Sequence, residues 1–88
     1  MNFEFTGILR KAANNNRLVA VNATTLAGAL VELADTFPSM RRVLFDNSGE
    51  LRKAHRVFLN GELVPHPDIA MSLGNEDRIE FFTAVAGG

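Results

Sequence analysis

The two glycines that end the sequence, Gly87 and Gly88, are the residues whose type and position suggest chemistry. Because glycine has no Cβ, two in succession can lie extended in a slot too narrow for other residues and leave the carboxyl carbon of Gly88 open to attack. A carboxylate is a poor electrophile until one of its oxygens becomes part of a good leaving group. This ending therefore predicts a partner protein that activates Gly88 with ATP. Small residues at a chain end also occur without any function, and composition alone favours neither interpretation.

The other side chains do not suggest a catalytic or metal site. The chain has no cysteine, which excludes disulfides, thiolate metal sites and a cysteine nucleophile. His55 and His66 stand alone, without a carboxylate or second histidine at metal-ligand spacing, and we expect both at the surface. The acidic residues late in the chain predict an acidic rim without an acid–base constellation: Asp68, Glu76, Asp77 and Glu80. We expect no bound metal or cofactor.

Length and composition predict one small domain with room for one sheet and about one or two helices. The 88 residues are 47% hydrophobic and 22% charged, and no apolar run is long enough to span a bilayer. The start of the sequence has no signal-peptide pattern, so we expect a soluble, cytoplasmic protein without a membrane partner. A net charge of −1 and the absence of tryptophan and tyrosine make nucleic acid an unlikely partner.

The first half of the sequence predicts two strands and a helix. Residues 1–6 and 17–22 alternate or cluster apolar side chains, and the asparagine-rich connector between them predicts an antiparallel pair joined by a long loop. Thr24 or Thr25 can cap a helix whose apolar stripe ends before Pro38, since a residue before proline is disfavoured in the α region. The stripe consists of Leu26, Leu30, Leu33 and Phe37.

The second half predicts a short helix and three strands. Residues 39–45 favour a short second helical turn, and Asn60-Gly61 between two apolar runs predicts a hairpin over residues 56–64. Residues 69–73 are expected to form a short helical or irregular cover. Residues 77–82 then predict a final buried strand. The resulting order is strand, strand, helix and three further strands.

This order resembles the ubiquitin-like β-grasp, an α+β fold with a mixed five-stranded sheet wrapped around one main helix. The ending, from Asp77–Phe82 to Ala84-Val85-Ala86-Gly87-Gly88, is similar to that of the MoaD/ThiS-type sulfur carriers, and the Asn60-Gly61-Glu62 turn is similar to CysO-like and MoaD-like members. The resemblance covers essentially the whole chain. It implies a β-grasp domain over residues 1–82 and a flexible diglycine tail over residues 83–88. Thr83 departs from the family, in which proline is common there.

The resemblance also implies a carrier rather than an enzyme. An E1-like adenylyltransferase would use ATP and magnesium to convert the Gly88 carboxylate to an acyl-adenylate. A sulfur donor would then displace AMP and leave a thiocarboxylate, which a downstream sulfur-accepting synthase would consume. The carrier itself would bind no cofactor. Which pathway takes the sulfur is left open.

A face of the sheet beside the tail is the expected docking surface. Alternation places Phe58 and Phe82 on the side opposite the helix, where they would form an exposed apolar patch. The resemblance implies partner contacts by Phe82, Leu63 and Arg10, and the tail residues Val85 and Ala86 would enter the partner with Gly87. Phe58 and Leu63 could instead pack against a loop.

Three other functions fit the same pattern. The chain could be the small subunit of a molybdopterin synthase, with its tail inserted into a larger subunit. It could be a protein modifier that forms isopeptide bonds from Gly88 to target lysines, with only Lys11 and Lys53 available for chains on itself. It could also be a non-catalytic interaction domain with an incidental diglycine.

Overall fold

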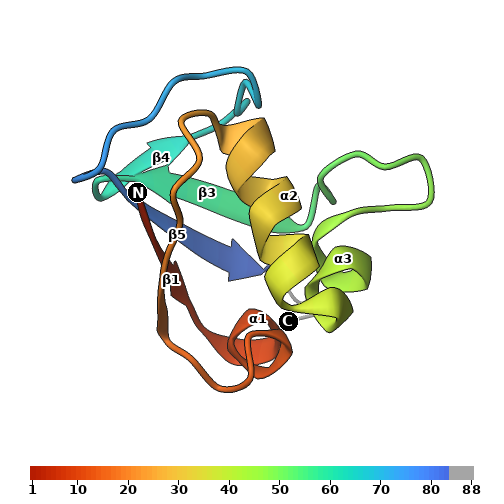
Figure 1. The fold of residues 1–88 in the computed structure, drawn as a ribbon. Helices are drawn as coiled ribbons and strands as arrows, with labels where there is room; N and C mark the ends of the chain where they lie inside the picture. Colours follow the sequence, from red (N-terminus) through yellow and green to blue (C-terminus); the bar gives the residue numbers. More distant parts are fainter. Residues whose placement is uncertain (84–88) are drawn as a thin grey trace.

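The protein folds into one mixed sheet covered on one face by helices. The computed structural model describes residues 1–83. Five strands lie in the order β2-β1-β5-β3-β4, with β1 parallel to the central β5 and the other pairs antiparallel. The strands are β1 (Asn2–Phe5), β2 (Leu18–Ala20), β3 (His55–Leu59), β4 (Glu62–Val64) and β5 (Arg78–Thr83). The mixed five-stranded sheet and its strand sequence are therefore confirmed (Figure 1).

The main helix, α2 (Leu26–Thr36), crosses one face of the sheet (Figure 1). Thr25 caps it, because its Oγ1 accepts a hydrogen bond of 3.1 Å from the Gly28 amide. Two more amides at this end donate to the irregular segment before β5, from Leu26 to the Met71 carbonyl and from Ala27 to the Ile69 carbonyl. These bonds satisfy donors that a helix N-terminus would otherwise leave open. The predicted apolar stripe is buried.

A second helix, α3 (Pro38–Leu44), follows α2 directly. Phe37 has φ −123° and leaves the helical region, and Pro38 then occupies the first turn of α3, where its missing amide costs nothing. Met40 and Leu44 are fully buried, so α3 closes one end of the core. Both the break at Pro38 and the short helix after it are as predicted.

The predicted long loop between the first two strands is wrong, because this connection contains α1 (Gly7–Ala12). The six residues have no side-chain cap, so local signals for a helix are weak. Leu9 and Ala12 are buried, which indicates that tertiary packing stabilises the helix. Two asparagines in the left-handed region, Asn14 (φ 57°) and Asn15 (φ 67°), end it and turn the chain toward β2.

The predicted hairpin over the middle of the chain is confirmed as β3 and β4. Asn60 (φ 51°) and Gly61 (φ 87°) both have positive φ, as a tight two-residue turn requires. The Asn60 side chain also accepts a bond from the Arg78 amide at 2.9 Å and donates to Asp77 at 3.0 Å. The turn therefore fixes the start of β5 as well as joining β3 to β4.

Three phenylalanines hold β1 and β5 against the helices. Phe3, Phe5 and Phe81 are at most 1% exposed, and their ring centroids lie 5.7 to 6.3 Å apart. Such contacts add to the stabilisation from burial. The pairing register of the central strand β5 and the direction of its side chains are therefore fixed as far as its last described residues. No helix within residues 1–83 is long and apolar enough to cross a membrane.

Candidate functional site

Strand β5 positions the residues that precede the diglycine. It lies between parallel β1 and antiparallel β3, so both of its edges are hydrogen-bonded. The structure keeps Thr83 in this strand, opposite His55, although the sequence had suggested that the tail begins there. The tail residues predicted to react or to contact a partner lie outside the described residues: Val85, Ala86, Gly87 and Gly88.

Alternation along β5 places Phe82 on the face of the sheet away from α2, as predicted. Ile79 and Phe81 point inward and are 1% exposed, whereas Phe82 is 44% exposed. On the neighbouring strand, Phe58 faces the same side and is half-buried. The two rings form an edge-to-face pair, with centroids 5.2 Å apart and an interplanar angle of 83°.

Leu63 extends this pair toward the edge of the sheet. It lies opposite Phe58 in the β3–β4 register and is 50% exposed. Phe58, Phe82 and Leu63 therefore form one apolar surface, here called the phenylalanine face. The structure thus brings together three of the predicted partner-binding residues.

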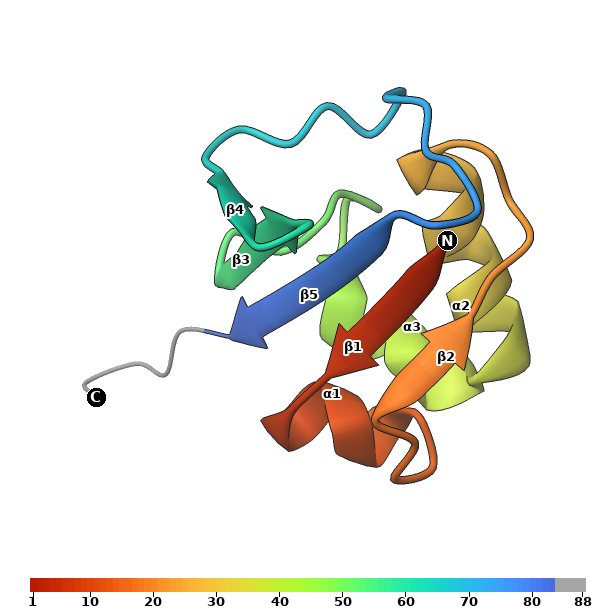
Figure 2. The same ribbon diagram turned by 90° about the vertical axis from the view of Figure 1, so that its left-hand side faces the viewer.

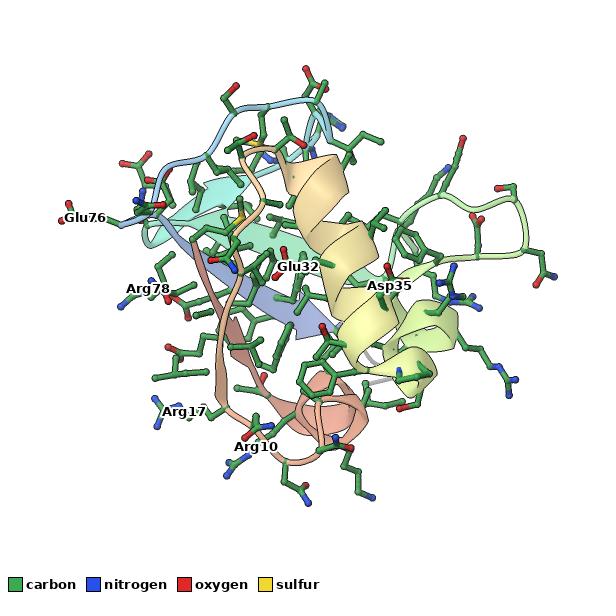
Figure 3. All side chains as sticks on the ribbon, in the orientation of Figure 1. Arg10, Arg17, Glu32, Asp35, Glu76 and Arg78 are labelled. Carbon is green, nitrogen blue, oxygen red and sulfur yellow. The ribbon has the colours of Figure 1, made fainter. Side chains whose placement is uncertain are left out.

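Charged side chains border the phenylalanine face on the same side of the sheet. Arg78 pairs with Glu80 at 3.3 Å, and Arg17 pairs with Glu4 at 3.6 Å. Figure 3 shows Arg17 and Arg78 pointing away from α2. These pairs separate the phenylalanine face from Leu18, an exposed leucine on β2 at the far edge. The apolar surface is consequently confined to the β5–β3–β4 side.

Arg10 lies on α1, outside the strands that carry the phenylalanine face. It is exposed on α1, and its Nε donates to the Asn15 carbonyl at 3.2 Å. Helix α1 follows β1, which is parallel to β5, so it lies at the end of the sheet where β5 ends (Figure 2). Arg10 is therefore placed near the exit of β5.

His55 is buried, so the expectation that it lies at the surface is wrong. It is 7% exposed and its ring bridges two elements. Nε2 lies 2.8 Å from the Val43 carbonyl and Nδ1 lies 3.1 Å from the Thr83 hydroxyl. A carbonyl can only accept, so Nε2 carries a proton, and in the neutral ring Nδ1 accepts from Thr83. His66, in contrast, is exposed as predicted.

Burial lowers the pKa of His55 below its usual value, and this effect outweighs the hydrogen bond to Val43, which raises the pKa. The ring is therefore neutral at physiological pH. It links the end of α3 to the last described residue of β5. The sequence carried a signal for this position, since His55 is two residues before inward-facing Val57 on the same strand.

Acidic residues near the start of β5 stabilise turns. Asp77 accepts bonds from the Gly74 amide at 2.7 Å and from the Asn60 side chain at 3.0 Å, and these bonds lower its pKa. Asp46 has a similar role in its own turn, and the Ser48 hydroxyl is the largest cause of its lowered pKa.

Within residues 1–83, no three histidine or acidic side chains gather closely enough to hold a metal ion.

Sequence comparison assigns the family. The ThiS family model matches residues 3–88, nearly the entire chain. The chain belongs to the ThiS family. Comparison with curated protein sequences finds no match. The classification of this ThiS family member rests on a match that runs through the diglycine.

Solved structures share the ubiquitin-like β-grasp of this ThiS family member. SAMP1 from Haloferax volcanii is 26% identical with a TM-score of 0.85, and the match covers 100% of this chain and 98% of that one. CysO from Mycobacterium tuberculosis is 22% identical with a TM-score of 0.81, covering 96% and 98%. A BexX/CysO complex from Amycolatopsis orientalis matches at 19% identity and a TM-score of 0.82, covering 99% and 98%.

Proposed function

We propose that this protein carries sulfur as a thiocarboxylate on Gly88. The observation that carries the proposal is the ThiS family match, which extends through the diglycine at the end of a β-grasp domain. The phenylalanine face supports it, because a carrier must dock on another protein before its terminus can react. An aromatic pair on β5 and its neighbour β3, with Phe82 exposed, suits that purpose.

The chemistry would proceed in two steps on a partner. A Gly88 carboxylate oxygen attacks the α-phosphorus of ATP, which forms an acyl-adenylate and releases pyrophosphate. Hydrosulfide or an equivalent sulfur donor then attacks the acyl carbon, and AMP leaves with the bonding electron pair. The product is a thiocarboxylate, whose sulfur is a better nucleophile than oxygen. ATP and magnesium belong to the E1-like adenylyltransferase.

Complex formation with a second protein has a structural precedent among the neighbours. One of the similar solved structures is a complex between CysO and BexX. A protein of the same fold therefore forms a complex with a second protein. The same behaviour here would involve the activating enzyme and then a sulfur-accepting synthase.

Intact mass is the direct test. Purified protein is incubated with ATP, magnesium, sulfide and an E1-like adenylyltransferase from the same cell, and a thiol-selective alkylating reagent is then added. Alkylation is needed because methionine oxidation adds nearly the same mass as exchange of oxygen for sulfur. Met1 and Met40 are buried, so the partly exposed Met71 is the main concern. The alkylated species should form with wild type and be absent after deletion of Gly88.

A second candidate function is protein modification. The structural neighbour SAMP1 from Haloferax volcanii is named small archaeal modifier protein 1, and the match to it, at 26% identity, covers the full chain. In that case the activated Gly88 carbonyl would be attacked by a lysine amine of another protein. Higher-mass conjugates that depend on Gly88 in a cell extract would support this function. Their absence, together with an alkylatable thiocarboxylate, would favour the sulfur carrier alone.

A further inference from the structure

A basic pocket opens beside the phenylalanine face, at the edge of the sheet formed by β4. Its volume is about 720 Å³. The charged residues that line it are Arg52, Lys53 and Arg56, with His66 beside them, and no aspartate or glutamate of the described chain is among its lining residues. These three are a third of the nine lysines and arginines in a chain of net charge −1. Positive charge is thus concentrated at one place.

The cations of the basic pocket are available to a ligand. Arg52, Lys53 and Arg56 are exposed, and none of them takes part in the ion pairs found within residues 1–83. The Arg52 guanidinium is held in place, because its Nε donates to the Arg42 carbonyl at 3.0 Å. The Arg52 charge interacts only weakly with Asp46, because it has the smallest of the effects that lower the pKa of the Asp46 carboxyl.

Apart from His55, whose ring nitrogens are bonded to Val43 and Thr83, the rest of the lining is apolar and continuous with the phenylalanine face. Leu63 belongs to both surfaces, and Arg56 lies opposite Phe82 in the β3–β5 register. The remaining apolar lining residues are Leu51, Val64, Pro65, Pro67 and Ile69. The pocket is far larger than a single phosphate or sulfate ion. Cations interspersed with leucine and proline match a peptide that carries both carboxylates and apolar side chains.

We propose that the basic pocket receives an acidic segment of the protein that docks on the phenylalanine face. Apolar side chains of the partner would contact Phe58 and Phe82, while its aspartates and glutamates would lie among Arg52, Lys53 and Arg56. This inference rests on the proposed function in taking the activating enzyme as that partner. Clustered charges raise the association rate at low salt and are screened at high salt. The pocket would therefore orient the carrier before its tail enters.

Association kinetics with the activating enzyme test this role. The pocket variant is Arg52→Gln/Lys53→Gln/Arg56→Gln, and the control Lys11→Gln/Arg41→Gln/Arg42→Gln removes the same charge elsewhere. The association rate constant of the pocket variant should fall about tenfold at about 50 mM salt and differ less than about threefold at about 500 mM. The control should stay within about twofold of wild type. Equal salt dependence of the pocket variant and the control would overturn the proposal.

A second variant separates recognition from folding. Arg52→Gln removes the bond to the Arg42 carbonyl, so the triple variant could lose stability. Lys53→Gln/Arg56→Gln keeps that bond and still removes two of the three charges. It should melt at the wild-type temperature and show an intermediate fall in association rate. A wild-type rate from this stable variant would contradict the pocket's role.

A peptide probe tests the pocket independently of the proposed function. The free protein is titrated with a capped peptide of alternating glutamate and leucine, with its glutamine counterpart and with inorganic phosphate, and amide NMR shifts are followed. The glutamate peptide alone should shift Lys53, Arg56 and His66. No shift with it, or equal shifts with phosphate at comparable affinity, would overturn an acidic peptide as the ligand. Failure of wild type to form a thiocarboxylate would instead count against the proposed function.

Discussion

At the residue scale, Phe82 differs from the other exposed apolar side chains in two ways. Its ring has an aromatic neighbour, and it lies near the end of the central strand β5. Its ring contacts Phe58, whereas Leu18 lies near the opposite edge of the same face behind two ion pairs. Aromatic residues in such positions often carry a large share of binding energy. Exposure alone would not distinguish the two residues.

Phe82→Ala should therefore weaken binding to the activating enzyme. We expect a loss of about 2 kcal/mol, or roughly 30-fold in Kd, because the aromatic anchor of the docking surface is removed. Stability should fall by only about 1 kcal/mol, since the ring is 44% exposed and mainly the edge contact with Phe58 is lost. Titration calorimetry measures the first and thermal melting the second. Leu18→Ala is the control, and equal Kd values for both variants would argue against the phenylalanine face.

His55 makes stability depend on pH in a direction set by its burial. Its pKa in the folded protein is below the usual value of about 6.5, so the unfolded chain binds a proton more readily. Stability from the neutral ring is fully present above the unfolded pKa and is lost as pH falls through the folded pKa. Part of the stability that the protein loses between about pH 7 and pH 5 should come from protonation of this residue.

His55→Gln should remove that part of the pH dependence. Glutamine does not titrate and can make only some of the bonds to the Val43 carbonyl and the Thr83 hydroxyl, so stability at neutral pH should fall by about 1–2 kcal/mol. Chemical denaturation at both pH values gives the difference. His66→Gln, at an exposed position, should leave it unchanged. Parallel pH curves for wild type and His55→Gln would show that other groups cause the loss.

At the element scale, the parts with strong local signals were predictable and the parts formed by tertiary packing were not. The helix break at Pro38, the Asn60-Gly61 turn and the stripe of α2 each rest on a local rule. Helix α1 has six residues and no side-chain cap, so only the burial of Leu9 and its neighbours reveals it. The burial of His55 is not predicted because the expected hairpin begins at residue 56, which leaves His55 outside the alternation that buries Val57.

The Thr25 cap offers a test of a locally encoded element. Thr25→Ala leaves the Gly28 amide without its acceptor and should reduce the free energy of unfolding by about 1 kcal/mol. Thr24→Ala is the matched control, because Thr24 contributes its backbone carbonyl to Leu73 and that carbonyl survives the substitution. Urea denaturation compares the two. Equal losses would mean that the bonds from Leu26 and Ala27 to the segment before β5 hold the helix start without Thr25.

At the scale of the whole molecule, docking and chemistry are expected to reside in different parts of the chain. The phenylalanine face is built on β3, β4 and β5, and the basic pocket is built on β3, β4 and the segments that flank them, within the described domain. The proposed reactive carboxyl belongs to Gly88, which follows that domain in sequence. A carrier built in this way presents the same docking surface to an enzyme whether or not its tail can react.

A protein that lacks Gly87 and Gly88 should therefore inhibit activation of wild type. The truncated protein keeps the docking surface but offers no diglycine carboxyl for adenylation, so it should compete with wild type for the enzyme. If the tail adds about 0.6 kcal/mol or less to binding, the inhibition constant should be within about threefold of the wild-type Kd. The measurement is the initial rate of alkylatable thiocarboxylate formation against added truncated protein. Adding Phe82→Ala to the truncated protein should raise the inhibition constant by the same factor as it raises Kd in the full chain. If a large excess of truncated protein leaves the rate unchanged, the last residues themselves provide most of the recognition, and the sheet face does not dock the enzyme.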